Sequence, residues 1–392
     1  MLRFDLLYEN KKRIKTKIEV GSINITYALS LSATLLFLQN ISLYQFKNYQ
    51  ERIFTFDKRI ICLTGMNGSG KTTLLDAIYF MCFTKSYFVH SDAMSVTKGK
   101  AGMRIAATMS DDKAHKVLCI LRESGKKEFS CDEVLYTQFS KHIGRFSCVF
   151  IAPDDTDLIS DGGEIRRKFL DILISQTNPN YMSDLIRYNK VLAQRNALLK
   201  QWQQLSIEDQ SIIGIYNQQL HEFGTRIFTV RNDVAAIIAQ KANSIYQFLS
   251  DEREQVTIQY VSRLAEKPLL DLLEQNQLKD IQSQRTNYGI HKDDLVFTLN
   301  EMPFKQVASQ GQRKSFLFGL KLAEYEWIKS HKSHSPLLLL DDIFEKLDIE
   351  RSQKLIDYIV ATNSQVFITD THFERIERAF TEHKELVQMI TL

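Results

Sequence analysis

The sequence has few cysteines and no strong excess of charge of either sign. Its five cysteines are odd in number and show no metal-site spacing, so they indicate reduced thiols in a cytoplasmic protein and argue against a disulfide framework. The 50 lysines and arginines nearly balance the 47 aspartates and glutamates, which leaves a net charge of +3. This small positive net charge is weak evidence for nucleic-acid binding, because a binding face requires local clustering of basic side chains.

Long apolar runs are also missing. A basic stretch at residues 11–17 precedes an apolar stretch at residues 23–38, but serine and threonine interrupt the latter. It falls short of the roughly 20 apolar residues that a membrane-spanning helix needs. We therefore expect no membrane partner, and we interpret residues 1–37 as an N-terminal extension outside the fold. The 44% apolar content of the chain suffices for a large core and more than one lobe.

A glycine-rich loop near the front of the chain fits the phosphate-binding pattern G-x-x-x-x-G-K-[ST]. It reads Gly65, Met66, Asn67, Gly68, Ser69, Gly70, Lys71 and Thr72. An apolar run at residues 59–64 predicts a buried strand before it, and helical spacing from Thr73 predicts a helix after it. In such a loop backbone N–H groups face phosphate, the lysine adds a positive charge and the Thr72 hydroxyl reaches Mg²⁺. We predict an ATP site; the alternative is a glycine turn with an incidental lysine.

Two acids follow an apolar run near the other end of the chain. Residues 337–340 are four leucines bounded by Pro336, which suits a parallel strand covered on both faces. Asp341 and Asp342 end this run, and adjacent acids at the edge of a core are costly unless a cation lies nearby. We predict that Asp341 holds Mg²⁺ together with Thr72, and that Asp342 orients or deprotonates the attacking water. The alternative is a strand that ends in a turn with solvated acids.

A third motif lies one predicted helix before these acids. Ser309 and Gln312 form a capping box for a helix at residues 314–329, which is a sufficient local reason for both residues. It does not explain Gly311, which weakens a first helical turn but lets a ligand approach the backbone. The pattern resembles the signature loop of ABC-type ATPases, which binds the terminal phosphate held by the opposite protomer.

Two weaker features complete this set. Asp348 follows the acidic pair at the distance expected of an ABC-type D-loop. His372 stands at the end of residues 365–371, which we interpret as the last strand. There it resembles the switch histidine that contacts the terminal phosphate, although an ordinary surface histidine is the alternative.

More than 200 residues separate Lys71 from Ser309, and this gap has helical periodicity. Its apolar stripe runs through Leu185, Tyr188, Leu192, Leu199 and Trp202, then Tyr216, Leu220, Phe223, Ile227, Val230, Val234 and Ile237. The steps of three and four predict a short helical arm, as a supercoil or as ordinary core-facing helices. We thus expect an α/β fold: a P-loop ABC-type ATPase head from residues 38–165 and 285–392, with a helical lobe at 166–284 inserted.

Two smaller predictions concern the ends of this insertion. Residues 293–299 and 302–307 predict a hairpin leading into the signature helix. Arg166, Arg167 and Lys168 stand where the lobe begins, and they either touch DNA phosphate or form a solvated helix face.

A split head with a helical insertion is the plan of the SMC and Rad50 group, and from about Leu38 onward the chain resembles the RecF family. The matching pieces are residues 41–49, 65–72, 153–159, 166–171, 194–196, 289–294, 309–313 and 339–342. Several of these are specific to RecF. The chain departs from the family at Ile290, where proline is usual, and at Lys292, where arginine is usual, which puts the local turn and any bidentate contact in doubt.

The resemblance implies a bacterial recombination mediator that dimerises on ATP. Such proteins bind double-stranded DNA next to single-stranded gaps and act with RecO and RecR so that RecA can load, in DNA repair, replication restart and the SOS response. It also implies that the P-loop residues and Thr73 bind phosphates and Mg²⁺, and that Ser309, Gly311, Gln312 and Asp348 meet the partner's ATP. Hydrolysis is expected to be slow and to release the clamp.

Two other classes remain possible from the sequence. An SMC-like ATPase that partners a phage-defence nuclease usually carries an appended effector region, and the sequence after His372 is short. A transport ATPase subunit would have a much shorter gap between the phosphate loop and the signature motif.

Overall fold

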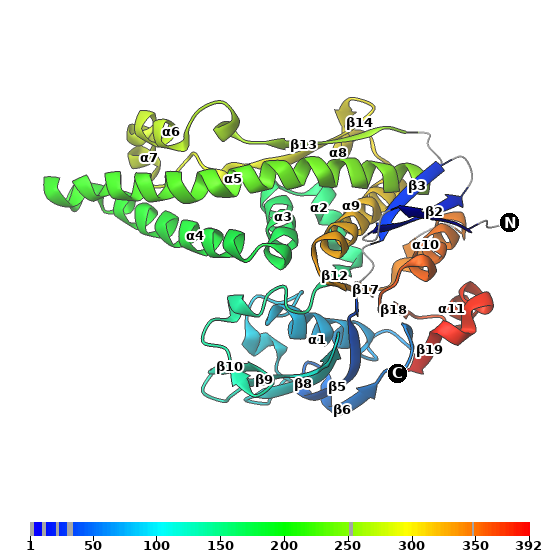
Figure 1. The fold of residues 1–392 in the computed structure, drawn as a ribbon. Coiled ribbons are helices and arrows are strands. Elements are labelled where there is room, and N and C mark those ends of the chain that lie inside the picture. Colours follow the sequence, from blue (N-terminus) through cyan, green and yellow to red (C-terminus); the bar gives the residue numbers. More distant parts are fainter. Residues whose placement is uncertain (1–3, 10–12, 21–22, 30–33, 251–253, 347–348) are drawn as a thin grey trace.

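The computed structural model describes residues 4–9, 13–20, 23–29, 34–250, 254–346 and 349–392. Figure 1 shows two lobes. The lower lobe holds an antiparallel sheet and helix α1 (Lys71–Phe83), and the upper lobe holds the long helices α4 (Pro179–Lys200) and α5 (Ile207–Ser250). Among the described residues, no helix combines the length and apolar character needed to cross a membrane.

A five-stranded parallel sheet lies between the two lobes. Its order is β12 (Cys148–Ile151), β17 (Leu337–Leu340), β18 (Val366–Asp370), β7 (Ile60–Thr64) and β19 (Val387–Thr391). The strands predicted before the phosphate loop and before the acids are confirmed as β7 and β17. The prediction that residues 365–371 form the last strand was wrong, because β19 follows β18 and pairs with β7. A short strand with mixed side chains is hard to recognise from periodicity alone.

The four leucines of β17 divide between two hydrophobic cores. Leu337 and Leu339 pack in the core that contains α1, whereas Leu338 and Leu340 pack in the core that contains α9 (Gln310–His331). Successive side chains of a strand point to opposite faces. An uninterrupted apolar run is therefore what a strand covered on both sides requires.

The lower lobe is closed by a six-stranded antiparallel sheet. Its order is β11 (Val134–Leu135), β10 (Lys127–Cys131), β9 (Ala114–Leu121), β8 (Met103–Ser110), β5 (Phe37–Phe46) and β6 (Tyr49–Thr55). Its buried face shares one core with α1 and with one face of the parallel sheet. Helix α1 is therefore held between two sheets, and the loop that precedes it is fixed at its end.

The expected extension at residues 1–37 contains strands. β1 (Phe4–Glu9), β2 (Arg13–Val20) and β3 (Ile23–Leu29) pair with one another in an antiparallel sheet. β4 (Thr34–Leu35) pairs with β16 (His334–Ser335), and Leu36 is fully buried. Residues 34–37 are thus joined to the head, a few residues earlier than the sequence indicated.

The upper lobe is mostly helical, as expected, but it also contains a strand. Its helices are α2 (Asp157–Ser160), α3 (Gly163–Thr177), α4, α5, α6 (Leu269–Gln275) and α7 (Gln277–Ser283). β13 (Val256–Val261) pairs with β14 (Asp294–Leu299), so the insertion and the C-terminal part of the chain share a sheet. Helices α10 (Ile349–Ala361) and α11 (Phe373–Ala379) flank the parallel sheet.

The predicted hairpin before the signature helix is present but shorter than expected. Its turn residues, Asn300 and Glu301, both have positive φ, which suits a tight two-residue hairpin. The second strand, β15 (Met302–Pro303), is brief, and residues 304–307 form the short helix α8 (Phe304–Val307) instead of continuing the strand.

Candidate nucleotide-binding site

The phosphate loop joins β7 to α1. Gly68 and Gly70 have φ values of +81° and +109°, in the left-handed region that favours glycine. A Cβ atom at Gly70 would lie 2.5 Å from the Tyr49 hydroxyl. That hydroxyl donates to the Gly70 carbonyl at 3.1 Å, and the Asn48 amide donates to the Gly68 carbonyl at 3.3 Å. The turn between β5 and β6 therefore supports the loop from outside.

Lys71 lies folded against this loop. Its Nζ donates to the carbonyls of Gly65 at 2.7 Å and Met66 at 3.1 Å, and the side chain is buried. Met66, Asn67 and Gly68 are exposed. The positive charge is thus held beside accessible backbone at the start of α1, where the helix dipole also favours an anion. This arrangement fits a phosphate chain.

The strand-end acid Asp341 meets Thr72 as predicted. The Thr72 hydroxyl lies 3.0 Å from both carboxylate oxygens of Asp341, although 269 positions separate the two residues in the chain. Thr369 of β18 donates to the same carboxylate at 2.8 Å. Two hydroxyl groups, one from helix α1 and one from strand β18, thus orient one buried acid.

The environment of Asp341 favours a cation. Burial raises its pKa to about 6 and the neighbouring charge of Asp342 adds to the rise, while hydrogen bonds from Thr369 and Thr72 and the charge of Lys71 oppose it. A buried carboxylate that lacks a cation is unfavourable in its charged form. A metal ion beside Asp341 would remove this penalty.

The oxygen atoms of Thr72 and Asp341 fit a magnesium ion. Hydroxyl and carboxylate oxygens are ligands that Mg²⁺ accepts, and neighbouring ligands of an octahedral Mg²⁺ with bonds of about 2.1 Å lie roughly 3 Å apart. The observed separation of 3.0 Å agrees with that spacing. Bound there with phosphate oxygens, Mg²⁺ would neutralise charge on the terminal phosphates.

Asp342 has an unusual backbone conformation. Its φ is +44°, and its N–H donates to the Thr369 hydroxyl at 2.8 Å. Aspartate tolerates this left-handed conformation better than most residues. Thr369 Oγ1 lies 2.8 Å from Asp341 Oδ1 and 3.4 Å from Asp342 Oδ1, and Asp342 stays partly exposed while Asp341 is buried. Such a difference in exposure suits two different roles.

The predicted capping box at the signature loop is confirmed. The Ser309 N–H donates to Gln312 Oε1 at 2.6 Å, and the Gln312 N–H donates to Ser309 Oγ at 3.2 Å. Ser309 is exposed, and Gly311 has only the Arg351 guanidinium near its missing Cβ. In both views α8, which leads into this loop, lies in the upper lobe, and α1 lies in the lower lobe. The loop is therefore far from the phosphate loop of its own chain.

The two weaker candidates, Asp348 and His372, differ in what the structure describes. Asp348 lies outside the described residues. His372 directly follows the pair Asp370 and Thr371 at the end of β18, and its side chain is exposed. Its backbone N–H donates to the buried Asp370 carboxylate at 2.7 Å, which fixes the backbone there. Its imidazole is thus available to a ligand at the same sheet edge.

Arg166 and Arg167 hold the fold together. Arg166 makes a two-point contact with Asp294 at 2.7 and 2.9 Å, and Arg167 donates to the Asp293 carbonyl at 2.6 Å. These contacts fasten α3 to the start of β14. Lys168 is exposed, and a contact of these residues with DNA phosphate stays a prediction.

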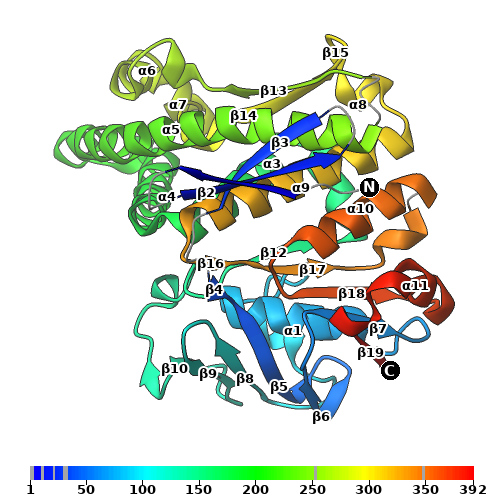
Figure 2. The same ribbon diagram turned by 45° about the vertical axis from the view of Figure 1, so that its right-hand side comes forward.

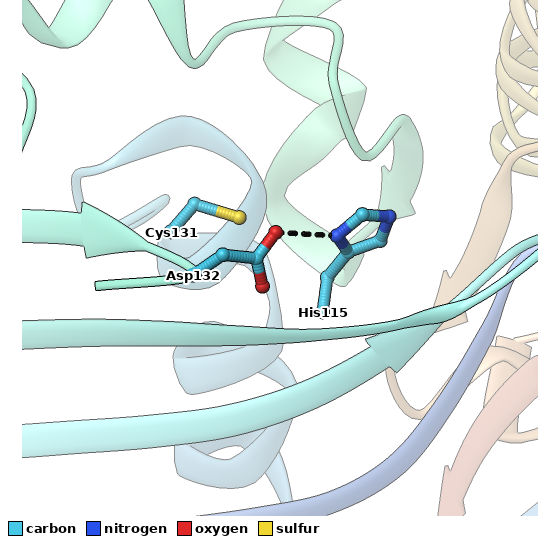
Figure 3. A group of neighbouring side chains, drawn as sticks. All are labelled: His115, Cys131 and Asp132. Atoms are coloured by element: carbon cyan, nitrogen blue, oxygen red, sulfur yellow. Dashed lines mark hydrogen bonds and ion pairs between the residues drawn. The ribbon is translucent and has the colours of Figure 1, made fainter. Parts of the chain in front are cut away.

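One group of side chains in the described part of the chain has the composition of a metal site. His115, Cys131 and Asp132 lie close together, and Figure 3 shows the Asp132 carboxylate facing the imidazole. His115 Nδ1 lies 2.7 Å from Asp132, and the Arg145 guanidinium lies 3.2 Å from this nitrogen and 3.3 Å from the carboxylate. A guanidinium among the ligand atoms opposes a second cation, so we interpret the group as an ion-pair network.

Sequence reasoning missed several residues around the site. Tyr49 and Asn48 support the phosphate loop, and Thr369 bridges the two acids. Asn48 and Tyr49 fall within the family-like segment at residues 41–49, which was a usable signal. Thr369 had none, because its partners lie 27 and 28 positions away, just after another strand.

Comparisons with known proteins agree with this geometry. Residues 37–391 match the family model described as RecF/RecN/SMC N terminal domain. A DNA replication and repair protein RecF from Flavobacterium johnsoniae is 42% identical over 342 residues, covering 87% of this chain and 95% of the relative. A RecF from Cytophaga hutchinsonii is 36% identical over 358 residues, covering 91% and 95%.

The fold also matches a solved structure. The recombination mediator protein RecF with ATP, of the RecFOR pathway, superposes with a TM-score of 0.81 at 26% identity, covering 87% of this chain and 94% of that one. The fold is therefore that of a P-loop ABC-type ATPase head, and the chain belongs to the RecF family.

Proposed function

We propose that two copies of this chain bind ATP and Mg²⁺ between them and, in that state, bind double-stranded DNA next to single-stranded gaps. The observation that carries the proposal is the contact of Thr72 with Asp341, since it joins the phosphate loop to the acidic strand end in magnesium-compatible geometry. The solved complex of a RecF relative with ATP supports the choice of nucleotide.

Each site needs residues from both copies. The phosphate-loop amides and Lys71 bind the phosphates of one ATP, and Ser309, Gly311 and Gln312 of the other copy meet its terminal phosphate. The distance between the two loops within one chain supports this division, since α8 and α1 lie in different lobes. Asp348 is assigned to the same interface on the family resemblance alone.

Hydrolysis is proposed to be slow. Asp342 is the candidate for water activation, and its side chain is one methylene shorter than the glutamate usual in transport ATPases. His372 would contact the terminal phosphate from the end of β18. ATP would then act as a clamp on the dimer, and its hydrolysis as the release. A steady-state rate comparable to that of fast motor ATPases would contradict this part.

In the cell the ATP-bound dimer is proposed to act with RecO and RecR at gapped DNA, so that RecA can load. This role places the chain in the bacterial cytoplasm, with DNA repair, replication restart and the SOS response as its settings. The family membership and the repair function named for its relatives support this assignment.

The test compares wild type with Lys71→Ala and Ser309→Arg. Dimerisation is measured by analytical ultracentrifugation with and without ATP, and gapped-DNA binding by fluorescence anisotropy. Wild type should dimerise and bind DNA only with ATP, and both variants should lose these responses. If both variants behave like wild type, the shared site does not exist.

A further inference from the structure

The side chain of the signature glutamine is held at both of its polar atoms. Gln312 Oε1 accepts the Ser309 N–H at 2.6 Å, and Gln312 Nε2 donates to a carboxylate oxygen of Glu254. The first contact is local, but the second spans 58 positions and reaches the segment between α5 and β13. A capping box needs only the first contact.

Glu254 is itself tied to the long helix. Its other carboxylate oxygen accepts the hydroxyl of Tyr246, which lies near the C-terminal end of α5. Tyr246 is fully buried, and its ring stands edge-on to Phe316 of α9, with centroids 5.9 Å apart and planes at 89°. A chain of contacts therefore runs from α5 through Glu254 to the signature loop.

Helices α5 and α9 are closely packed near Tyr246. A Cβ atom at Gly319 of α9 would lie 2.9 Å from the backbone carbonyl of Ala242 in α5. Such an approach of backbones leaves little room for sliding. A displacement of α5 must therefore move the start of α9 as well.

The chemistry of the contact sets the orientation of the glutamine amide. A carboxylate only accepts hydrogen bonds, so the NH₂ end of Gln312 must face Glu254 and the carbonyl end must face the Ser309 N–H. Without Glu254 the amide can turn, and the turned amide would place a donor against the Ser309 donor. The Ser309 N–H would then lose its acceptor, and the capping box would keep only the hydrogen bond from the Gln312 N–H to the Ser309 hydroxyl.

We infer that Glu254 and Tyr246 are positioning residues for Gln312, and that they connect helix α5 to the loop that meets the partner's nucleotide. The inference rests on the proposed function, in which this loop completes the ATP site of a second copy. It makes α5 the element through which contacts on the arm act on ATP-dependent dimerisation.

The first test needs no nucleotide or dimer. Hydrogen–deuterium exchange of residues 309–313 is compared in wild type, Glu254→Ala, Glu254→Gln and Tyr246→Phe. We expect faster exchange in Glu254→Ala, a smaller increase in Tyr246→Phe and little change in Glu254→Gln, which can still accept from Gln312. Unchanged exchange in Glu254→Ala would overturn the inference, whatever the oligomeric state.

The second test measures the ATP-dependent dimer by analytical ultracentrifugation, and ATP affinity of the monomer by titration. Loss of a charged hydrogen bond should weaken the Glu254→Ala dimer by about tenfold, with the monomer's ATP affinity unchanged. Glu222→Ala, which removes an exposed carboxylate of α5, serves as the control.

The outcomes separate the two proposals. If wild type dimerises with ATP and the Glu254→Ala dimer is equally tight, only the inference is overturned. A wild type that stays monomeric with ATP overturns the proposed function, and the exchange result then decides the positioning role by itself. Equal weakening by Glu222→Ala would show a general effect of removing a carboxylate and would overturn the inference.

Discussion

At the scale of single residues, the Thr369 hydroxyl contacts both Asp341 and Asp342. Its hydroxyl donates to Asp341 and accepts from the Asp342 backbone, both at 2.8 Å, and it is fully buried. A buried partner that loses its hydrogen bond costs about 1–3 kcal/mol. The Asp341 carboxylate and the Asp342 backbone therefore depend on one hydroxyl group.

Thr369→Val should weaken Mg²⁺-dependent ATP binding by about tenfold, because the Asp341 carboxylate loses one of its two orienting hydroxyls. Thr369→Ser, which keeps the hydroxyl, should bind nearly as wild type does. Titration with a fluorescent ATP analogue, with and without Mg²⁺, measures this. Equal affinity of the valine variant in Mg²⁺ would remove Thr369 from the site.

Glu324 of α9 should make stability depend on pH. Burial raises its pKa from 4.5 to about 7; the Asp155 charge adds to the rise, and Lys321 opposes it. Between about pH 4.5 and 7 the folded chain therefore binds more protons than the unfolded chain, so this group's contribution to stability falls as pH rises.

Urea unfolding at several pH values compares wild type with Glu324→Gln to test this. The variant should gain stability relative to wild type as pH rises from 5 to 8. Parallel pH profiles for the two proteins would mean that Glu324 titrates normally.

The sequence showed those site residues whose signal is local. The phosphate loop and the capping box are contiguous, and Asp341 and Asp342 end an apolar strand. Thr369 and Glu254 could not be predicted, because each acts through residues far away in the chain. The pairing of Arg166 could not be predicted for the same reason, since its partner, Asp294, lies 128 positions later.

At the scale of elements, a buried ion pair holds the outer part of the arm together. Arg195 of α4 donates to Asp280 of α7, to Asn217 of α5 and to Thr286, each at 2.8 Å. Arg195 and Asp280 are both fully buried. The family-like segment at residues 194–196 thus contains a structural residue that joins three helices.

Arg195→Met should destabilise the chain by about 3–5 kcal/mol, because it leaves the buried Asp280 charge without its cation. Lys190→Met, on an exposed position of the same helix, should change stability by less than about 0.5 kcal/mol. Urea unfolding monitored by circular dichroism gives both values. A loss below about 1 kcal/mol for Arg195→Met would show that water or another residue replaces the pair.

The buried face of α5 follows the predicted apolar stripe over only part of the helix. The predicted stripe fits through Leu220, Ile227 and Val234, but Ile237 is 40% exposed and Ile238 is buried in its place. The first part of α5 packs on α4, and the later part packs on α9. The buried face of α5 shifts around the helix where its packing partner changes from α4 to α9. A straight α-helix also drifts from a seven-residue repeat.

At the scale of the whole molecule, strands from the N-terminal and C-terminal parts of the head join in one parallel sheet. β7 lies between β18 and β19, and the Leu392 N–H donates to the Thr64 carbonyl at 2.9 Å, next to the phosphate loop. Local runs predicted β7 and β17 as strands, but strand order is a property of the assembled sheet. The position of β19 beside the loop was therefore beyond sequence reasoning.

The same architecture places the phosphate loop and the signature loop in different lobes. A mixed dimer of Lys71→Ala and Ser309→Arg would combine the intact phosphate loop of one chain with the intact signature loop of the other. It would therefore contain one complete site and one site with both defects.

The most direct measurement is ATP-dependent dimerisation of the two variants, alone and as an equimolar mixture, by analytical ultracentrifugation. Neither variant should dimerise alone, and the mixture should form a heterodimer that binds one ATP. If mixing restores nothing while each variant stays folded, the two loops do not act across a shared interface.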